Sequence, residues 1–167
     1  FTHTNKGHWN LCHIPLLPVT GTPTPGDYCS PFSHGRESAA PGYYRVFLDR
    51  YGVDAEVSST LRCAFHKYTY PDGAAASLLA DLQRSNEHVR AWEIHKEGDN
   101  VFAGWQQTGE KMYFYAVANR PVTGVEPVVE GDREIRIVRF GEGAGPLELQ
   151  IGFSFVSQKN ARENLEA

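Results

Sequence analysis

The apolar side chains of residues 53–65 recur at every second position. One parity holds Val53, Ala55, Val57, Leu61, Cys63 and Phe65, and the other parity is mostly polar or charged. A period of two predicts a β-strand with one buried and one solvated face. The segment is long for a single strand, so we expect a bend or bulge near residues 58–60.

The same alternation returns over residues 147–155, close to the end of the chain. Further strands are expected at residues 43–48, 89–95, 101–107, 111–118 and 133–140. Turn-forming sequences at residues 70–73, 97–100 and 107–110 separate several of them. Short strands divided by such turns predict an antiparallel sandwich or barrel.

Two segments carry helix-forming residues. Residues 74–83 hold four alanines and three leucines, but the segment is short and follows a turn inside a run of strands, so a strand is favoured. Residues 157–167 predict a helix with Ser157 as its N-cap. The expected fold class is therefore all-β, an antiparallel, supersandwich-like β-sandwich with a short C-terminal connector helix.

Composition places the chain among ordinary globular proteins. Hydrophobic residues make up 41%, charged residues 22% and aromatic residues 12% of the 167 positions, which excludes a disordered or collagen-like chain. The formal net charge of -4 lacks the basic footprint of nucleic-acid binding. No apolar run reaches the roughly 20 residues that a bilayer-spanning helix needs. We expect neither a nucleic-acid partner nor a membrane span.

Residues 1–41 differ in texture from the rest of the chain. They hold six prolines and four histidines and only scattered apolar residues, which predicts mostly loop. Loops on a rigid scaffold are where binding groups usually lie. The three cysteines, Cys12, Cys29 and Cys63, allow at most one disulfide, and their spacing leaves open whether any pair forms.

Four potential zinc ligands lie close together in this loop: His3, His8, Cys12 and His13. Imidazole and thiolate groups bind zinc well, but the spacing matches no standard zinc pattern. The alternative is a polar loop whose histidines bond to the backbone, and we expect no metal ligand set in this chain.

Other candidates are aromatic or acidic. Trp9 lies in a glycine-containing loop, where an indole stacks on a sugar ring or else plugs the loop against the sandwich. His34 is positioned to orient Glu37 as an acid or base, whereas Arg36 is equally placed to neutralise Glu37 as a surface pair. Asp54 and Glu56 share one strand face and point out in parallel, so they do not flank a glycosidic bond.

Ten short strings occur in a fixed order along nearly the whole chain. They are FTHT at 1–4, LLPVTG at 16–21, FSH at 32–34, PGYY at 41–44, AEV at 55–57, TLR at 60–62, HKYTYP at 66–71, GWQ at 104–106, YFY at 113–115 and IGFSFVS at 151–157. Together they resemble the N-terminal domain of the glycoside hydrolase family 92 α-mannosidases.

The resemblance implies a β-sandwich, residues 1–156, that packs against a C-terminal (α/α)6-type helical domain, with the active site in the cleft between them. Such enzymes are exo-acting, inverting and calcium-dependent, and they release mannose from α-mannosides such as those of N-glycans or mannans. The general acid, the general base and most of the calcium shell belong to the helical domain, so no catalytic residue is expected in this chain. Family habit implies a secreted or periplasmic protein.

On this resemblance, residues 1–41 face the cleft, and residues 157–167 begin the helical linker to the partner domain. The candidate substrate-binding residues are Trp9, His8, His3, His13, His34 and Glu37. His13 stands where the family commonly has an aspartate, and the loop before it is short, which leaves the mannoside linkage open. The alternative is a stand-alone β-sandwich module for carbohydrate binding or interaction.

Overall fold

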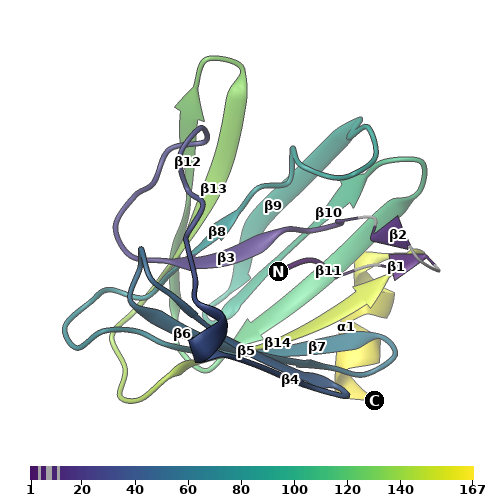
Figure 1. Ribbon diagram of the computed structural model, residues 1–167. Coiled ribbons are helices and arrows are strands. Elements are labelled where there is room, and N and C mark those ends of the chain that lie inside the picture. Colours follow the sequence, from purple (N-terminus) through teal and green to yellow (C-terminus); the bar gives the residue numbers. More distant parts are fainter. Residues whose placement is uncertain (4, 7–8, 11) are drawn as a thin grey trace.

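The computed structural model describes residues 1–167 except 4, 7, 8 and 11, and it describes only the backbone of residues 5, 6, 9 and 10. Two antiparallel sheets face each other as a sandwich (Figure 1). The large sheet runs in the order β4 (Glu37–Ala40), β5 (Tyr43–Leu48), β6 (Val53–Ser59), β7 (Cys63–Thr69), β14 (Leu147–Ser154), β11 (Lys111–Ala118), β10 (Val101–Gln107) and β9 (Ala91–Gly98). The predicted sandwich is confirmed.

The small sheet covers part of the large one. Its order is β12 (Val122–Glu130), β13 (Arg133–Phe140), β8 (Ser77–Ala80) and β3 (Leu16–Val19). Of the strand expected at residues 74–83, only β8 forms, and all four of its residues are buried, which explains the lack of an alternating pattern there. A two-stranded hairpin, β1 (Asn5–Lys6) with β2 (Trp9–Asn10), and a short 3-10 turn, η1 (His34–Arg36), complete the first part of the chain.

The prediction of one strand over residues 53–65 is wrong. The chain reverses at residues 60–62, so that β6 and β7 pair as an antiparallel hairpin. The reversal also exchanges the two faces: Ala64, His66 and Tyr68 are buried, whereas Cys63 and Phe65 are only partly buried. Leu61, expected in the core, lies at the tip of the turn and is 94% exposed.

Residues 1–41 are mostly loop, as expected, with the short strands β1, β2, β3 and β4 among them. Another expectation was incomplete. The strand β12 had no counterpart in the predictions, since Pro127 interrupts it and its residues are mostly exposed or half-buried. Together with β13 it forms a hairpin that projects beyond the rest of the sandwich (Figure 1).

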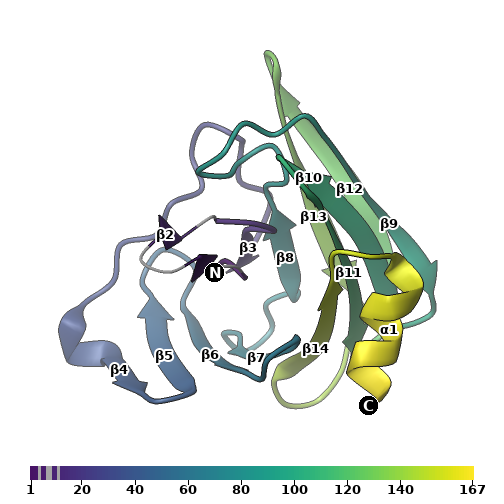
Figure 2. The same ribbon diagram turned by 90° about the vertical axis from the view of Figure 1, so that its right-hand side faces the viewer.

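The helix α1 (Gln158–Glu166) lies on the outer face of β14 and β11 (Figure 2). The Ser157 side chain accepts a hydrogen bond from the Asn160 backbone N–H at 3.1 Å, which confirms the predicted N-cap. A side chain at Gly152 would place its Cβ 2.1 Å from the Ala161 carbonyl oxygen. Glycine at this position therefore allows the helix to contact the sheet. No helix of the described residues is long and apolar enough to cross a membrane.

Candidate functional site

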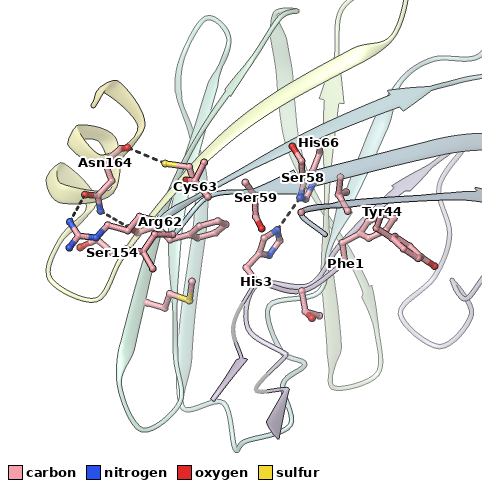
Figure 3. A pocket seen from close by; sticks show the side chains of 18 of the residues that line it. Phe1, His3, Tyr44, Ser58, Ser59, Arg62, Cys63, His66, Ser154 and Asn164 are labelled. Atoms are coloured by element: carbon pink, nitrogen blue, oxygen red, sulfur yellow. Dashed lines mark hydrogen bonds between the residues drawn. The ribbon is translucent and has the colours of Figure 1, made fainter. Parts of the chain in front are cut away.

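A hollow of about 970 Å³ opens beside the first residues of the chain, where β6 ends and β5 and β7 begin (Figure 3). Phe1, Thr2 and His3 form one wall, and Tyr44 and His66 contribute aromatic rings. The lining also includes Leu61, Phe155 and Val156, three apolar side chains that are mostly exposed and are called the apolar rim here. The hollow is therefore lined by aromatic and small residues and bordered by an apolar rim.

Two histidines from distant parts of the chain meet inside this hollow (Figure 3). His3 Nε2 lies 3.3 Å from His66 Nε2, and the two rings stack with centroids 5.2 Å apart. His3 Nδ1 lies 2.8 Å from the Ile14 carbonyl oxygen, and His66 Nδ1 lies 2.7 Å from the Tyr68 hydroxyl. All four imidazole nitrogens thus have a hydrogen-bond partner.

Burial keeps both imidazoles neutral. Desolvation is the largest of the effects that lower the pKa of His3 to about 3. The pKa of His66 also falls well below its ordinary value, first through burial and then through His3. Burial raises the pKa of Tyr68 well above the usual range, so its hydroxyl remains a donor.

Aromatic contacts fix the first residues against the large sheet. The Phe1 ring packs edge-on against Tyr44, with centroids 6.5 Å apart, and stacks on Tyr68 at 6.2 Å. The His3 ring lies 4.8 Å from the Phe153 ring. The N-terminal wall of the hollow is consequently a packed layer on β5, β7 and β14.

His34 of η1 and Glu37 of β4 form a pair. His34 Nδ1 lies 2.5 Å from Glu37 Oε2, and the Tyr44 hydroxyl donates to Glu37 Oε1 at 2.6 Å. These bonds, from Tyr44 first and His34 second, lower the pKa of Glu37. The alternative pairing with Arg36 is not observed, because Arg36 binds Asp49. Glu37 is thus connected to the hollow through Tyr44.

His13 lies apart from the hollow. It is 3% exposed, and its Nε2 atom is 3.0 Å from Thr108 Oγ1, which in turn donates to Glu87 at 2.7 Å. The residues on either side, Cys12 and Ile14, have φ angles of 58° and 48°. A left-handed conformation is strained for a β-branched residue. The Ile14 N–H bond to Gln106 Oε1, at 2.7 Å, helps to hold it.

The remaining two candidates lie outside the described side chains. Trp9 belongs to β2 by its backbone, and its side chain is not described; His8 is not described at all. Of the predicted binding residues, the structure therefore brings His3 into the hollow, connects Glu37 and His34 to it, and separates His13 from it.

The carboxylates of β6 form ion pairs with side chains of the neighbouring strands. Asp54 pairs with Arg45, and Glu56 pairs with Lys67 at 3.0 Å and with the Tyr43 hydroxyl at 2.7 Å. The interpretation of these two acids as a solvated strand face is confirmed.

No ligand set for a metal ion converges in the described part of the chain. No three side chains of His, Cys, Asp or Glu come together there. Calcium prefers six to eight oxygen ligands, so the calcium ion that the resemblance implies does not fit these residues. Cys12, Cys29 and Cys63 form no disulfide with one another.

Sequence reasoning missed three members of the site: Tyr44, His66 and Tyr68. All three belong to strings that carry the family resemblance, PGYY and HKYTYP. The last two lie beyond the strand expected at residues 53–65, so no face of the sheet was assigned to them.

Three solved structures resemble the whole sandwich. The GH92 α-mannosidase BT3965 from Bacteroides thetaiotaomicron is 25% identical, with a TM-score of 0.83 over 93% of this chain and 26% of that chain. The GH92 family glycosyl hydrolase ccman5 is 26% identical, with a TM-score of 0.76 over 91% of this chain and 25% of that chain. The family GH92 inverting mannosidase BT2199 from Bacteroides thetaiotaomicron VPI-5482 is 21% identical, with a TM-score of 0.73 over 92% of this chain and 23% of that chain. At this identity the likeness supports the fold alone.

The chain spans about a quarter of the length of these solved relatives. No curated protein matches it in sequence. Residues 1–162, nearly the whole chain, match the glycosyl hydrolase family 92 N-terminal domain. The chain therefore belongs to glycoside hydrolase family 92, as an N-terminal domain of that family.

Proposed function

We propose that this chain is the sandwich half of an exo-acting, inverting, calcium-dependent α-mannosidase, and that it supplies loops to the cleft that holds the α-mannoside. The observation that carries the proposal is the match of residues 1–162 to the family 92 N-terminal domain, together with the likeness to the α-mannosidase BT3965. We assign the general acid, the general base and the calcium ligands to a helical (α/α)6-type domain elsewhere in the polypeptide.

This division of labour has a direct test. A glycosidase needs two carboxyl groups on opposite sides of the scissile bond, and the acids described in β6 pair with neighbouring cations on one strand face. We expect purified residues 1–167 to show no turnover of an aryl α-mannoside, and the full-length polypeptide to hydrolyse it with inversion. Turnover by residues 1–167 alone contradicts the proposal.

The apolar rim of the hollow is the surface that we assign to the partner domain. Leu61 is 94% exposed and Val156 is 75% exposed, and Phe155 lies beside them on the same hollow. Monomeric proteins rarely leave contiguous apolar patches uncovered. A helical domain seated on this rim would remove these side chains from water.

Leu61→Ser tests this assignment. In residues 1–167 alone it should leave the thermal midpoint unchanged, because the side chain has almost no contacts to lose. In the full-length polypeptide it should lower the midpoint of the coupled transition by several degrees. Val129→Ser, at a 62% exposed position on the projecting hairpin, is the matched control and should be neutral in both. A full-length Leu61→Ser protein with an unchanged midpoint removes the partner domain from this rim.

Trp9 is the residue of this chain that we assign to sugar stacking. An indole covers the apolar face of a sugar ring and retains a donor for a hydroxyl group. In the full-length enzyme, Trp9→Ala should lower kcat/KM for mannosides at least tenfold, equivalent to about 1.4 kcal/mol of transition-state stabilisation. The control is Trp105→Ala. Trp105 lies on β10, its ring lies under the Lys111 ammonium, and it does not line the hollow. An unchanged kcat/KM for Trp9→Ala retires the assignment.

The alternative function, a stand-alone carbohydrate-binding module, is favoured only by the open, aromatic-lined hollow. It requires that residues 1–167 bind mannose by themselves. Calorimetry at millimolar mannose distinguishes the two functions, since the enzyme half is expected to give no binding heat. The proposed location, outside the cell or in the periplasm, follows family habit and is tested by fractionation of the source cells.

A further inference from the structure

We infer that the row of hydrogen bonds Tyr68–His66–His3 is a latch, which holds the first residues of the chain on the large sheet while both imidazoles are neutral and releases them when the row takes up a proton. The inference rests on the geometry of these side chains alone, and it stands or falls independently of the proposed enzymatic function.

The distances admit one arrangement of protons in the neutral row. The Ile14 carbonyl oxygen is only an acceptor, so His3 Nδ1 carries the hydrogen of their 2.8 Å bond. His3 Nε2 then has a lone pair, and His66 Nε2–H must donate to it across 3.3 Å. His66 Nδ1 is left as an acceptor for the Tyr68 hydroxyl at 2.7 Å. The two histidines thus have opposite tautomers.

An added proton breaks this arrangement. On His3 it would occupy Nε2 and place two N–H groups against each other, at the 3.3 Å separation of the two nitrogens. On His66 it would place a full charge beneath the aromatic layer, where the ring is 2% exposed. A buried charge without a counter-charge is costly.

The surroundings of the row offer no anion among the described residues. The groups that face it are the phenols of Tyr68 and Tyr44, the rings of Phe1 and Phe153 and, beside Phe1, the thiol of Cys12. A positive charge on either imidazole would repel a charge on the other. Protonation is therefore relieved most easily by separating His3 from His66.

The latch controls a defined piece of backbone. The Phe1 N–H group and the Phe1 carbonyl oxygen both bond to Leu16, at 2.7 and 2.9 Å, and the His3 N–H bonds to the His13 carbonyl oxygen at 3.1 Å. The first three residues reach the large sheet mainly through the rings of Phe1 and His3. Since these residues wall the hollow, releasing them widens it.

The test uses nitrogen-15 NMR of the histidine side chains in the full chain between pH 8 and pH 4. At pH 7.5 we expect the Nδ1–H tautomer for His3 and the Nε2–H tautomer for His66. Between pH 7 and pH 5, the backbone amides of His3 and Leu16 should exchange at least tenfold faster relative to amides of β11, after correction for intrinsic rates. His95→Gln, on β9 and outside the row, is the matched control variant.

Tyr68→Phe is the conservative perturbation. It removes the donor to His66 Nδ1 and keeps the ring, so His66 should lose its single tautomer while β11 amides keep their protection. The inference is overturned if both imidazoles of the wild-type chain are charged at pH 7, or if the His3 and Leu16 amides are equally protected at pH 7 and pH 5. It is also overturned if both Nε2 atoms lack a proton and EDTA alters their signals, because the pair then clamps a metal ion.

Discussion

The contact between α1 and β14 depends on the absence of a side chain at Gly152, and Gly152→Ala should disrupt it. The new Cβ would lie 2.1 Å from the Ala161 carbonyl oxygen and 3.1 Å from Leu165 Cβ. The first of these atoms belongs to the helix backbone, so no side-chain rotation relieves the overlap. The helix must retreat by roughly 1 Å to restore an ordinary contact distance.

The cost follows from overpacking. Inserting one methyl group into a closely packed contact costs about 1–3 kcal/mol. We expect about 2 kcal/mol here, because fully buried Ala161 moves together with the helix. For a chain of 167 residues, that loss lowers Tm by roughly 4–8 °C. The helix amides of residues 158–166 should lose hydrogen-exchange protection earlier than those of β11.

Gly109→Ala is the matched control. Gly109 lies in the turn between β10 and β11 and has no atom within 4 Å of the position that its Cβ would take. The two variants therefore add the same methyl group, one into a contact and one into open space. Chemical denaturation and hydrogen exchange of both variants form the assay. A Gly152→Ala protein with the wild-type midpoint and wild-type helix protection refutes the reasoning.

Three further predictions concern buried polar groups. Gln106→Leu should lower the free energy of unfolding in urea by about 2–4 kcal/mol. Gln106 is 1% exposed, accepts from the Ile14 N–H and donates to two carbonyl oxygens, and all three bonds are lost. An unchanged midpoint contradicts this. Tyr28→Phe should cost about 1–3 kcal/mol, since buried Asp81 loses the hydroxyl that donates to it at 2.6 Å; Tyr28→Phe stability equal to wild type would show that water replaces the donor. Lowering the pH from 6.5 to 5 should reduce the free energy of unfolding by up to about 2 kcal/mol per histidine held neutral. The folded-state pKa of His3 is lowered to about 3, so the unfolded chain binds more protons than the folded chain in this range. The contribution of His3 to stability is therefore full above pH 6.5 and falls as the pH falls. Denaturation midpoints that do not change with pH would contradict this prediction.

Strands with one face on the core and one in water could be predicted from the sequence. The bounds of β5, β10, β11 and β13 match the expected residues 43–48, 101–107, 111–118 and 133–140. In β5 and β11 the buried positions alternate with more exposed ones, and in β13 the inward positions are apolar and most outward positions are charged, so this alternation is visible without any tertiary information. The cap of α1 was equally local, because Ser157 bonds to the N–H of Asn160.

Elements that depend on tertiary contacts could not be predicted. The turn between β6 and β7 contains Thr60, Leu61 and Arg62, which carry no glycine or proline signal, and the apolar Leu61 continues the alternation across the reversal. The parity of β7 was therefore reversed. In β12, Pro127 and the neighbouring exposed positions remove the alternation, although the strand pairs along its length with β13.

The site was predictable only where its contacts are local. His34 and Glu37 are three residues apart and form the expected pair. His3 was identified as a candidate, but its partner His66 is 63 residues away, and nothing in either local sequence indicates their contact. His13 meets Thr108 across 95 residues of chain, which explains why its separation from the hollow could not be foreseen.

The projecting hairpin has a consequence for self-association. Its outer strand β12 leaves a row of backbone groups without a neighbouring strand in the small sheet, which is the usual starting point for polymerisation through sheet edges. Pro127 offers no N–H, and the charged side chains of Glu126 and Glu130 accompany it. The far edge of the large sheet is formed by β4, which has only four residues. These two borders thus discourage fibril growth, even though the hairpin extends far into solvent.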